Sequence, residues 1–517
     1  MSTITSPFPP VPISDKTMTQ RVFDGIDPDM TILVDGPSGR PMTGAEFIAA
    51  VKSLAGGLNA AGLGAGKCVA IMAPNLPEYC VVAHGVAWAG GTITTINPTY
   101  TAPEVAYQLA DAGADLLITV APFADIATQA ARGTGVQDIV VIGEAPPGTT
   151  PLSALMGPAQ DTQTPVDAAN HVVALPYSSG TTGLPKGVML THRNLVVNIS
   201  QMLAPADVDA GELTLAFLPF FHIYGLQVLM NVYLAAGGGL VTMPRFDLEM
   251  FLELACKYRT RRLWVVPPVA LALAKHPVVD TYDLSHVEQV FSAAAPLGGD
   301  VAEALATRLG TTVAQGYGMT ELSPASHISP GGKGKPGASG VTVPNTECRI
   351  INPDTGASLA PTDTGEVLVR GPQVMKGYLN NPDATAETID PDGWLHTGDI
   401  GRFDEDGFLY LTDRVKELIK VKGFQVAPAE LEATLLAHPA VTDAAVIGVP
   451  DNASGEVPMA FVAAAAGNAP SLQDIQAFFE GRLAHYKQIR HLRVVETVPK
   501  SPSGKILRRQ LRDEIGI

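Results

Sequence analysis

Short apolar runs rich in β-branched residues alternate with alanine-rich stretches through the first half of the chain. An apolar run of about four to eight residues is typical of a strand, and a longer stretch with apolar positions three or four residues apart is typical of an amphipathic helix. This alternation predicts layered α/β structure, because helices must cover the faces of a sheet. The predicted strands are 67–73, 91–96, 114–120 and 262–266, and the predicted helices are 77–89, 102–112, 251–258 and 300–309.

Glycine and charge become more frequent after about residue 335, where the pattern favours antiparallel strands. Residues 366–370 form one predicted strand, and 400–403 with 408–412 form a hairpin that turns at 404–407. Beyond Arg414 the pattern predicts a compact α+β unit. Its elements are a helix opened by Pro428, strands at 444–449 and 459–464, a helix at 472–483 and a strand at 492–497.

The change of pattern at Asp413–Lys416 indicates a domain boundary. At 517 residues the chain is too long for a single core and is expected to form two or more domains. We therefore predict an N-terminal domain of residues 1–414 and a C-terminal domain of residues 415–517.

One apolar stretch, Leu226–Met243, is long enough to suggest a membrane span. Gln227, Asn231 and the glycines at 237–239 interrupt it, so a buried helix, a glycine turn and a strand are predicted instead. The N-terminal residues lack the basic and apolar regions of a secretory signal, and residues 515–517 differ from a peroxisomal Ser-Lys-Leu signal. The expected location is the cytoplasm.

The composition, with 46% hydrophobic residues and 42 prolines, is typical of a globular, loop-rich enzyme. A net charge of −17, from 34 basic and 51 acidic residues, disfavours nucleic acid and anionic membranes as partners. An anionic ligand would therefore have to be held by local positive charge. The cysteines are far apart without CxxC spacing, and we predict reduced structural thiols rather than disulfides or a zinc site. They are Cys68, Cys80, Cys256 and Cys348.

A segment rich in glycine and hydroxyl groups, 177–187, lies between the apolar runs 172–177 and 187–190. Glycine lets backbone N–H groups approach an anion, hydroxyl groups add donors, and a lysine supplies a mobile positive charge. The segment is not a Walker P-loop, because Lys186-Gly187 continues into an apolar run instead of opening a helix. Taken alone, the segment leaves open both a phosphate-binding loop and a flexible surface hairpin. The candidate phosphate-binding residues are Ser178, Ser179, Gly180, Thr181, Thr182 and Lys186.

This segment resembles the phosphate loop of the adenylate-forming superfamily, which includes acyl-CoA synthetases, firefly-type luciferases and the adenylation domains of peptide synthetases. Further blocks follow in the family's order from about residue 30 to the C-terminus, and they are most similar to those of 4-coumarate:CoA ligases. The blocks are 221–225 (FHIYG), 315–321 (QGYGMTE), 393–399 (GWLHTGD), 413–420 (DRVKELIK), 422–430 (KGFQVAPAE) and 499–507 (PKSPSGKIL). The resemblance implies a large N-terminal domain of layered α/β subdomains with a β-rich subdomain, and a small, mobile α+β C-terminal domain.

The resemblance places ATP and Mg²⁺ at the second of these blocks. Tyr317 is expected to stack on adenine, Thr320 to contact phosphate and Glu321 to hold Mg²⁺, which prefers carboxylate and phosphate oxygens. Gln315 and Gly316 belong to the same expected cofactor-binding set. Taken alone, Thr320 and Glu321 are more typical of the start of a helix.

Two residues farther along complete the expected nucleotide site. By resemblance, Asp399 accepts hydrogen bonds from the ribose hydroxyls, and Arg414 reaches the ribose or the α-phosphate. Without the resemblance, Asp399 would be interpreted as an Asx turn and Arg414 as half of a surface salt bridge.

Lys505 is the expected catalytic residue of adenylation. When a carboxylate attacks the α-phosphorus of ATP, negative charge develops on phosphate and carboxylate oxygens together, and an ammonium group between them stabilises the transition state. The neighbouring Arg508, Arg509 and Arg512 are predicted to form only a solvated helix face.

A second polar group, on the C-terminal unit, is expected to serve transfer to coenzyme A. A Lys-x-Lys-Gly sequence is by itself more typical of a β-turn. By resemblance, Lys422 and Gly423 line the pantetheine tunnel, while Lys420 and Gln425 face the intermediate as catalytic residues. The resemblance also implies that the small domain rotates about Lys416, also a cofactor-binding candidate, between adenylation and thioester formation.

The acyl pocket is predicted around His222 and Tyr224. By resemblance, His222 lies near the acyl carboxylate as a catalytic residue and Tyr224 forms a wall, although a histidine after an aromatic pair is otherwise typical of a core. The other expected substrate-binding residues are Phe291, Ala294, Gly318 and Pro324.

This pocket departs from the plant 4-coumarate pattern. Phe291 stands where plant enzymes usually carry lysine, 227–228 (Gln-Val) replaces Asn-Ser, and 325–326 (Ala-Ser) replaces Val-Leu. Arg245 replaces a lysine linked to coenzyme A. These changes leave ATP and coenzyme A handling in place and leave the acid open.

The predicted function is an ATP-dependent acid:CoA ligase that acts through an acyl-adenylate, with ATP, Mg²⁺, coenzyme A and a small carboxylic acid as its ligands. A 4-coumarate or cinnamate type of acid is the first choice, and a fatty or other aryl acid is the alternative. A luciferase-like monooxygenase and a non-catalytic or carrier-loading module are the other classes, the latter disfavoured by Lys505. No nucleic acid partner and no integral membrane segment are expected, and the oligomeric state stays open.

Overall fold

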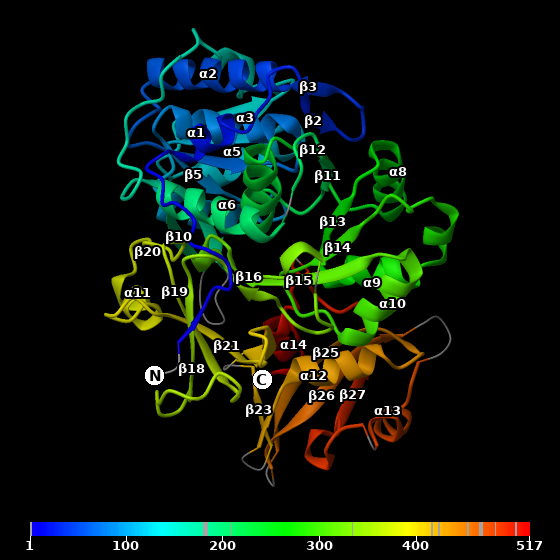
Figure 1. Ribbon diagram of the computed structural model, residues 1–517. Coiled ribbons are helices and arrows are strands. Elements are labelled where there is room, and N and C mark those ends of the chain that lie inside the picture. The colour runs from blue at the N-terminus through cyan, green and yellow to red at the C-terminus, as the bar shows by residue number, and fades with distance from the viewer. Residues whose placement is uncertain are drawn as a thin grey trace.

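The computed structural model describes residues 3–178, 185–206, 208–332, 334–414, 417–421, 424–451, 454–464, 469–480, 482–501 and 504–517. Figure 1 shows a large upper body of helices and sheets, a β-rich part at its lower left, and the C-terminal residues as a compact unit at the lower right. The expected α/β class with a separate C-terminal domain is confirmed.

The largest sheet has parallel strands at its centre and an antiparallel edge. Its order is β20 (Gly377–Tyr378), β10 (Lys186–Thr191), β9 (Val172–Ser178), β5 (Thr92–Thr95), β4 (Cys68–Met72), β6 (Leu116–Val120), β7 (Asp138–Ile142) and β8 (Thr150–Pro151). All five residues of β4 are buried, as expected for a strand covered on both faces.

Helices cover both faces of this sheet. On one face Val69 and Ile71 of β4 share a core with α2 (Gly44–Ala60) and α3 (Pro77–Trp88). On the other face Ala70 and Met72 pack with α4 (Ala102–Asp111) and α5 (Ala124–Ala131). Successive side chains of one strand thus enter two different cores, because the side-chain period of a strand is two.

Two further sheets extend the large body. The first has the order β11 (Leu213–Ala216), β12 (Gly239–Thr242), β2 (Thr31–Asp35) and β3 (Pro41–Thr43). The second has the order β13 (Arg262–Val265), β14 (Gln289–Ser292), β15 (Thr312–Gly318), β16 (Ala325–Ile328) and β17 (Val341–Thr342). The helices α8 (Leu248–Tyr258), α9 (Pro267–Lys275) and α10 (Gly299–Leu309) connect or follow these strands, and α6 (His192–Ala206) follows β10.

The β-rich part is an antiparallel sheet. Its order is β1 (Ile4–Thr5), β18 (Glu347–Ile351), β19 (Gly365–Arg370), β21 (Leu395–Phe403) and β22 (Leu409–Arg414). The predicted hairpin is confirmed, and the pairing of β21 with β22 sets Asp399 opposite Arg414.

The C-terminal domain has apolar cores made only of residues from 419 onward. Its strands are β23 (Ile419–Val421), β24 (Phe424–Val426), β25 (Val441–Asp451), β26 (Gly455–Ala464) and β27 (His491–Val494), and its helices are α12 (Pro428–Leu436), α13 (Leu472–Phe479) and α14 (Arg508–Ile515). α13 ends at Phe479, earlier than the predicted 483, because Glu480 adopts an extended backbone at the C-cap. A boundary between residues 414 and 415 stays a prediction.

The segment predicted as helix, turn and strand has that order. A π-helix, η3 (Tyr224–Val232), continues into α7 (Tyr233–Ala235), and β12 follows after a turn. Among the helices of the described residues, none is both long enough and apolar enough to cross a bilayer. All four cysteines are described and unpaired, with Cys256 alone partly exposed.

Candidate active site

A cavity of about 1100 Å³ lies between the large body and the C-terminal domain. The large body contributes the ends of β9 and β10, the start of η3, and β14 and β15, while the C-terminal domain contributes Lys505 and the start of α14. The site candidates among its lining residues are Ser178, Lys186, His222, Tyr224, Phe291, Ala294, Gly316, Tyr317, Gly318, Thr320, Glu321, Pro324, Arg414 and Lys505.

One end of the cavity is built around Tyr317, Asp399 and Arg414. The Tyr317 hydroxyl donates to Asp399 Oδ2 at 2.6 Å, and Arg414 Nε lies 3.0 Å from Asp399 Oδ1. Burial and the Asp399 carboxylate raise the pKa of Tyr317, and the same carboxylate raises the pKa of Arg414. The tyrosine therefore stays protonated and the arginine charged, which leaves a neutral aromatic ring beside a partly buried ion pair.

A second group lies where β10 leaves the glycine-rich segment. Lys186 Nζ sits 4.4 Å from the centre of the Tyr378 ring, and the Tyr378 hydroxyl donates to Glu321 Oε1 at 2.8 Å. Glu321 is 3% exposed, and Thr320 precedes it on a short 3₁₀ turn. One carboxylate, with its second oxygen outside this hydrogen bond, fits Mg²⁺, which keeps several waters and takes phosphate oxygens from its substrate.

Lys505 and His222 face the cavity from opposite domains. Burial, followed by the charge of Arg414, lowers the pKa of Lys505 to about 8. Burial, followed by the charge of Lys505, lowers the pKa of His222 to about 4. Near pH 7 the site therefore presents an ammonium group and a neutral imidazole, whose Nδ1 accepts a hydrogen bond from the Tyr224 N–H at 3.2 Å.

Aromatic side chains line the inner part of the cavity. Phe291 and Trp264 are both buried, with ring centres 4.5 Å apart, and Tyr224 is 6% exposed. Trp264 was not predicted from the sequence, where it stands in an apolar run typical of a buried strand. Its Nε1 donates to the hydroxyl of Tyr233 at 2.6 Å, and this hydrogen bond fixes the orientation of the ring.

Three described candidates lie outside this lining, and Asp399 is one of them because its carboxylate is buried against Tyr317 and Arg414. Both the amide nitrogen and oxygen of Gln315 are engaged with the backbone of Leu297, at 3.2 and 3.0 Å, so Gln315 supports a neighbouring loop. Lys420 is exposed on β23, where its N–H donates to Glu456. Ser179, Gly180, Thr181, Thr182, Lys416, Lys422, Gly423 and the side chain of Gln425 lie outside the described residues.

The interpretation of Arg508 as part of a solvated helix face is wrong. Its side chain is 13% exposed, and Nη2 donates to both carboxylate oxygens of Glu432, at 2.7 and 2.8 Å. Arg512 pairs with Glu417 at 3.3 Å and is partly buried, whereas Arg509 is exposed as predicted. The basic run gave no signal of this, because Glu432 is 76 residues away in the chain.

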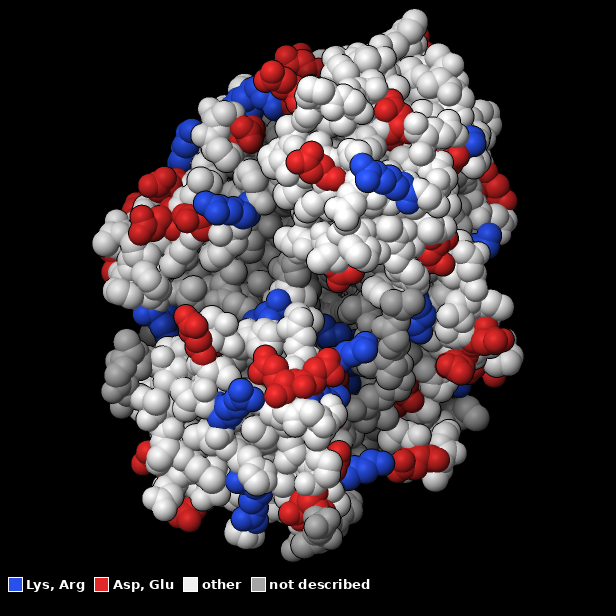
Figure 2. Space-filling model, turned by 180° about the vertical axis from the view of Figure 1, so that it is seen from behind, with Lys and Arg blue, Asp and Glu red and all other residues white. Residues whose placement is uncertain are grey.

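The charge distribution explains how an acidic chain can hold anions. Figure 2 shows acidic and basic side chains mixed over the back of the molecule, with basic side chains gathered near the hollow across its middle. Lys186, Arg414 and Lys505 line the cavity, so local positive charge is present despite a net charge of −17.

Comparisons with known proteins agree with this geometry. A family model described as AMP-binding enzyme matches residues 25–379, and one described as AMP-binding enzyme C-terminal domain matches residues 430–505. The chain is 43% identical over 499 residues to 4-coumarate–CoA ligase 1 of Petroselinum crispum, covering 94% of this chain and 91% of that ligase.

Solved structures are similar over almost the whole chain. ATP-bound MatB from Rhodopseudomonas palustris is 31% identical with a TM-score of 0.88, covering 97% of this chain and 99% of MatB. The anthranilate CoA ligase AuaEII in complex with anthranoyl-AMP is 26% identical with a TM-score of 0.90, covering 98% of each chain.

Proposed function

The chain belongs to the AMP-binding enzyme family, and we propose that it converts an aryl acid of the 4-coumarate or cinnamate type into its coenzyme A thioester. It is an ATP-dependent acid:CoA ligase that acts through an acyl-adenylate. The acid, the roles of individual residues and the use of Mg²⁺ are parts of the proposal, as is a cytoplasmic location.

One observation carries the adenylation step of the proposal. Lys505, from the C-terminal domain, lines the same cavity as Tyr317, Glu321 and His222 of the large body. A cation that a separate domain brings to a nucleotide-sized cavity suits a reaction in which charge develops on two substrates at once.

In the proposed adenylation step, Tyr317 and Arg414 hold the nucleoside, and Lys186 and Thr320 hold the phosphates. His222 is neutral near pH 7 and can donate a hydrogen bond to the acid without neutralising its carboxylate. The ammonium group of Lys505 then lies between carboxylate and α-phosphate and stabilises the transition state. Glu321 would hold Mg²⁺, which supplies charge neutralisation on the phosphates when it is bound.

The second step is proposed to use the other face of the C-terminal domain. Lys420 is exposed and away from the cavity, as expected of a residue that reaches the intermediate only after the small domain rotates. Gln425, Lys422 and Gly423 keep their predicted roles within this proposal.

The aromatic lining supports an aryl acid. Tyr224, Trp264 and Phe291 offer flat apolar walls. By the family resemblance, Phe291 stands where plant enzymes usually carry lysine. A ring hydroxyl that loses a buried partner costs roughly 1–3 kcal/mol, about 5- to 150-fold in discrimination. We therefore expect cinnamate to be used nearly as well as 4-coumarate.

The test measures kcat/KM for cinnamate, 4-coumarate, ferulate and a series of medium-chain fatty acids. The small side chain of Ala325 in the cavity lining leaves room for the methoxyl group of ferulate, so ferulate should also be a substrate. A fatty acid that exceeds every aryl acid would overturn the aryl assignment and leave a general acyl-CoA synthetase.

The residue assignment is tested with Lys505→Ala. The rate of adenylation, measured as pyrophosphate release in the absence of coenzyme A, should fall about 10²- to 10³-fold. This is the effect of removing one preorganised donor from a transition state. Conversion of supplied acyl-AMP and coenzyme A to thioester should persist. Normal adenylation by this variant would show that Lys505 is not the catalytic cation.

A further inference from the structure

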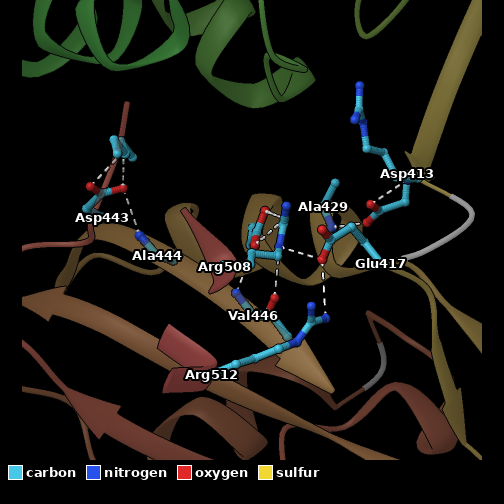
Figure 3. A network of polar contacts seen from close by, with 11 residues as sticks. Asp413, Glu417, Ala429, Asp443, Ala444, Val446, Arg508 and Arg512 are labelled. Atoms are coloured by element: carbon cyan, nitrogen blue, oxygen red, sulfur yellow. Dashed lines mark hydrogen bonds and ion pairs between the residues drawn. The ribbon is translucent and has the colours of Figure 1, made fainter. Parts of the chain in front are cut away.

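Arg508 ties the segment after Lys505 to the interior of the C-terminal domain. Its guanidinium donates to both oxygens of Glu432 on α12 and, through Nε, to the Val446 carbonyl on β25 at 3.1 Å. The Val446 N–H in turn donates to Glu432 Oε1 at 2.8 Å. Figure 3 shows Arg508 beside Val446 in this group. Arg508 Nη2 is shared between the two Glu432 oxygens while Nε binds Val446, so one planar and largely buried guanidinium joins α12 to β25 in one geometry.

Lys500 ties the segment before Lys505 to the same strand. Its Nζ lies 2.7 Å from both oxygens of Asp443 on β25, and Asp443 Oδ1 also accepts from the Ala444 N–H at 2.9 Å. Both ends of the short segment around Lys505 are therefore fixed to β25.

Lys505 itself is held through its backbone. Its N–H donates to Ser501 Oγ at 3.1 Å, and its carbonyl accepts from the Ser501 N–H at 2.8 Å. No salt bridge among the described residues includes its ammonium group, which leaves that group available to a ligand in the cavity. The position of the ammonium is therefore set by the segment that carries it.

We propose that Arg508 with Glu432, and Lys500 with Asp443, form a clamp whose role is to position Lys505 for adenylation. All four residues belong to the C-terminal domain, so the clamp can remain intact when that domain moves. A catalytic cation acts only if it lies at the point where charge develops, and a displacement of about 1 Å can cost about 10²-fold. The inference rests on the proposed role of Lys505.

The first test is Arg508→Lys, which keeps the positive charge and removes the planar fork. Adenylation kcat should fall about 10- to 100-fold, with the KM for ATP and for the acid changed little. Thioester formation from supplied acyl-AMP should stay within about threefold. Arg493→Lys is the matched control, because Arg493 is exposed on β27 of the same domain, and it should behave as wild type.

Glu432→Gln should reproduce this selective loss, and the double variant with Arg508→Lys should be no worse than the more severe single variant, because both changes break one pair. If Arg508→Lys yields too little folded protein, Lys500→Gln provides the comparison of the two half-reactions, while the pH limit is read only in Arg508→Lys because Lys500→Gln removes a positive charge from the cavity lining. The Lys500–Asp443 pair is partly solvated, at 21% and 26% exposure, so its loss disturbs the fold less.

The pH profile separates positioning from general damage. In wild type, the alkaline limit of adenylation should follow the Lys505 pKa of about 8. In Arg508→Lys, a loosened and more solvated Lys505 should move that limit toward the ordinary value of 10.5. The shift would report position, because the charge at residue 508 is unchanged.

Equal loss of both half-reactions, or an unchanged pH limit with normal adenylation, would overturn the clamp. Lys505→Ala, measured in parallel, distinguishes the catalytic role of Lys505 from its positioning by the clamp. Normal adenylation by Lys505→Ala would show that the proposed role of Lys505 is wrong. If Lys505→Ala loses adenylation but Arg508→Lys slows both half-reactions equally, only the clamp is wrong.

Discussion

Lys505 and His222 differ in charge near pH 7 because burial lowers both pKa values from different ordinary values, 10.5 for the lysine and 6.5 for the histidine. Burial disfavours the charged form of both side chains, and it lowers the pKa of Lys505 to about 8 and that of His222 to about 4. The lysine starts from a high pKa and stays mostly protonated, while the histidine starts near neutrality and loses its proton. One desolvated cavity thus supplies both a cation and a neutral hydrogen-bonding ring.

The pKa of Lys505 predicts how adenylation depends on pH. Adenylation should decline as the pH rises through about 8, because Lys505 loses the proton that gives it charge. On the acid side, His222 should cause no loss until the pH nears 4. The measurement is kcat/KM for acid-dependent exchange of pyrophosphate into ATP between about pH 6 and 10, because kcat/KM reports the pKa values of the free enzyme.

Lys505→Arg is the control for this profile. Arginine keeps its charge throughout the range, so the variant should be slower than wild type but flat up to about pH 10. A wild-type profile that is also flat would show that Lys505 is not the titrating group.

At the scale of elements, the π-helix η3 sets the acyl pocket because it brings Tyr224 to the cavity at its first position. The close approach of the chain behind it depends on Gly225. A Cβ at this position would lie 2.2 Å from the Pro219 carbonyl oxygen and 2.5 Å from that of Leu218. Backbone oxygens cannot move aside as a flexible side chain can, so glycine is required here.

We predict that Gly225→Ala destabilises the large body by about 1–3 kcal/mol and weakens acid binding, because η3 must shift away from the preceding loop. Gly299→Ala is the matched control, since a Cβ there meets nothing within 4 Å at the start of α10. The control should be neutral or stabilising by about 0.4–1 kcal/mol. Urea midpoints and the KM for the acid measure both effects, and equal midpoints for the two variants would contradict the packing argument.

At the scale of the whole molecule, the C-terminal domain rests on the large body beside the cavity. Gly504, at φ +81°, packs against Val266 and Pro268 of the large body. Lys275 Nζ donates to the Leu436 carbonyl at 3.3 Å, and the Ala429 N–H donates to Asp413 Oδ2 at 2.8 Å. These contacts accompany the orientation in which Lys505 lines the cavity, and thioester formation is proposed to require another.

This arrangement predicts a disulfide that locks the domains. A Cβ built on Gly504 lies 3.4 Å from Val266 Cβ, close to the separation of about 3.5–4.5 Å found in disulfides. Oxidised Val266→Cys/Gly504→Cys should retain adenylation and lose thioester formation. A reductant should restore the second step.

Cys256→Ser provides the background for this experiment, because Cys256 is the native thiol that is not buried. The single variant Gly504→Cys reports any cost of a side chain at a positive φ, which is expected under both redox conditions. Undiminished thioester formation by the oxidised, fully cross-linked enzyme would contradict domain rotation.

Much of this organisation was readable from the sequence because it is local. A short apolar run rich in β-branched residues and flanked by turn residues favours a strand through local sequence alone, and β4, β6 and β19 lie close to their predicted bounds. The motif blocks could also be read directly, since Tyr317 with Glu321, and Lys505 after its glycine, each lie within a few residues of one another.

The contacts that complete the site were decided only by tertiary structure. Tyr317 meets Asp399 across 82 residues, Arg508 meets Glu432 across 76, and Trp264 reaches the cavity through its place beside Phe291 in a parallel sheet. Such pairings depend on strand order and on how the two domains pack. Residue spacing along the chain determines neither of these. For that reason a basic run that was interpreted as a solvated helix face contains a buried arginine.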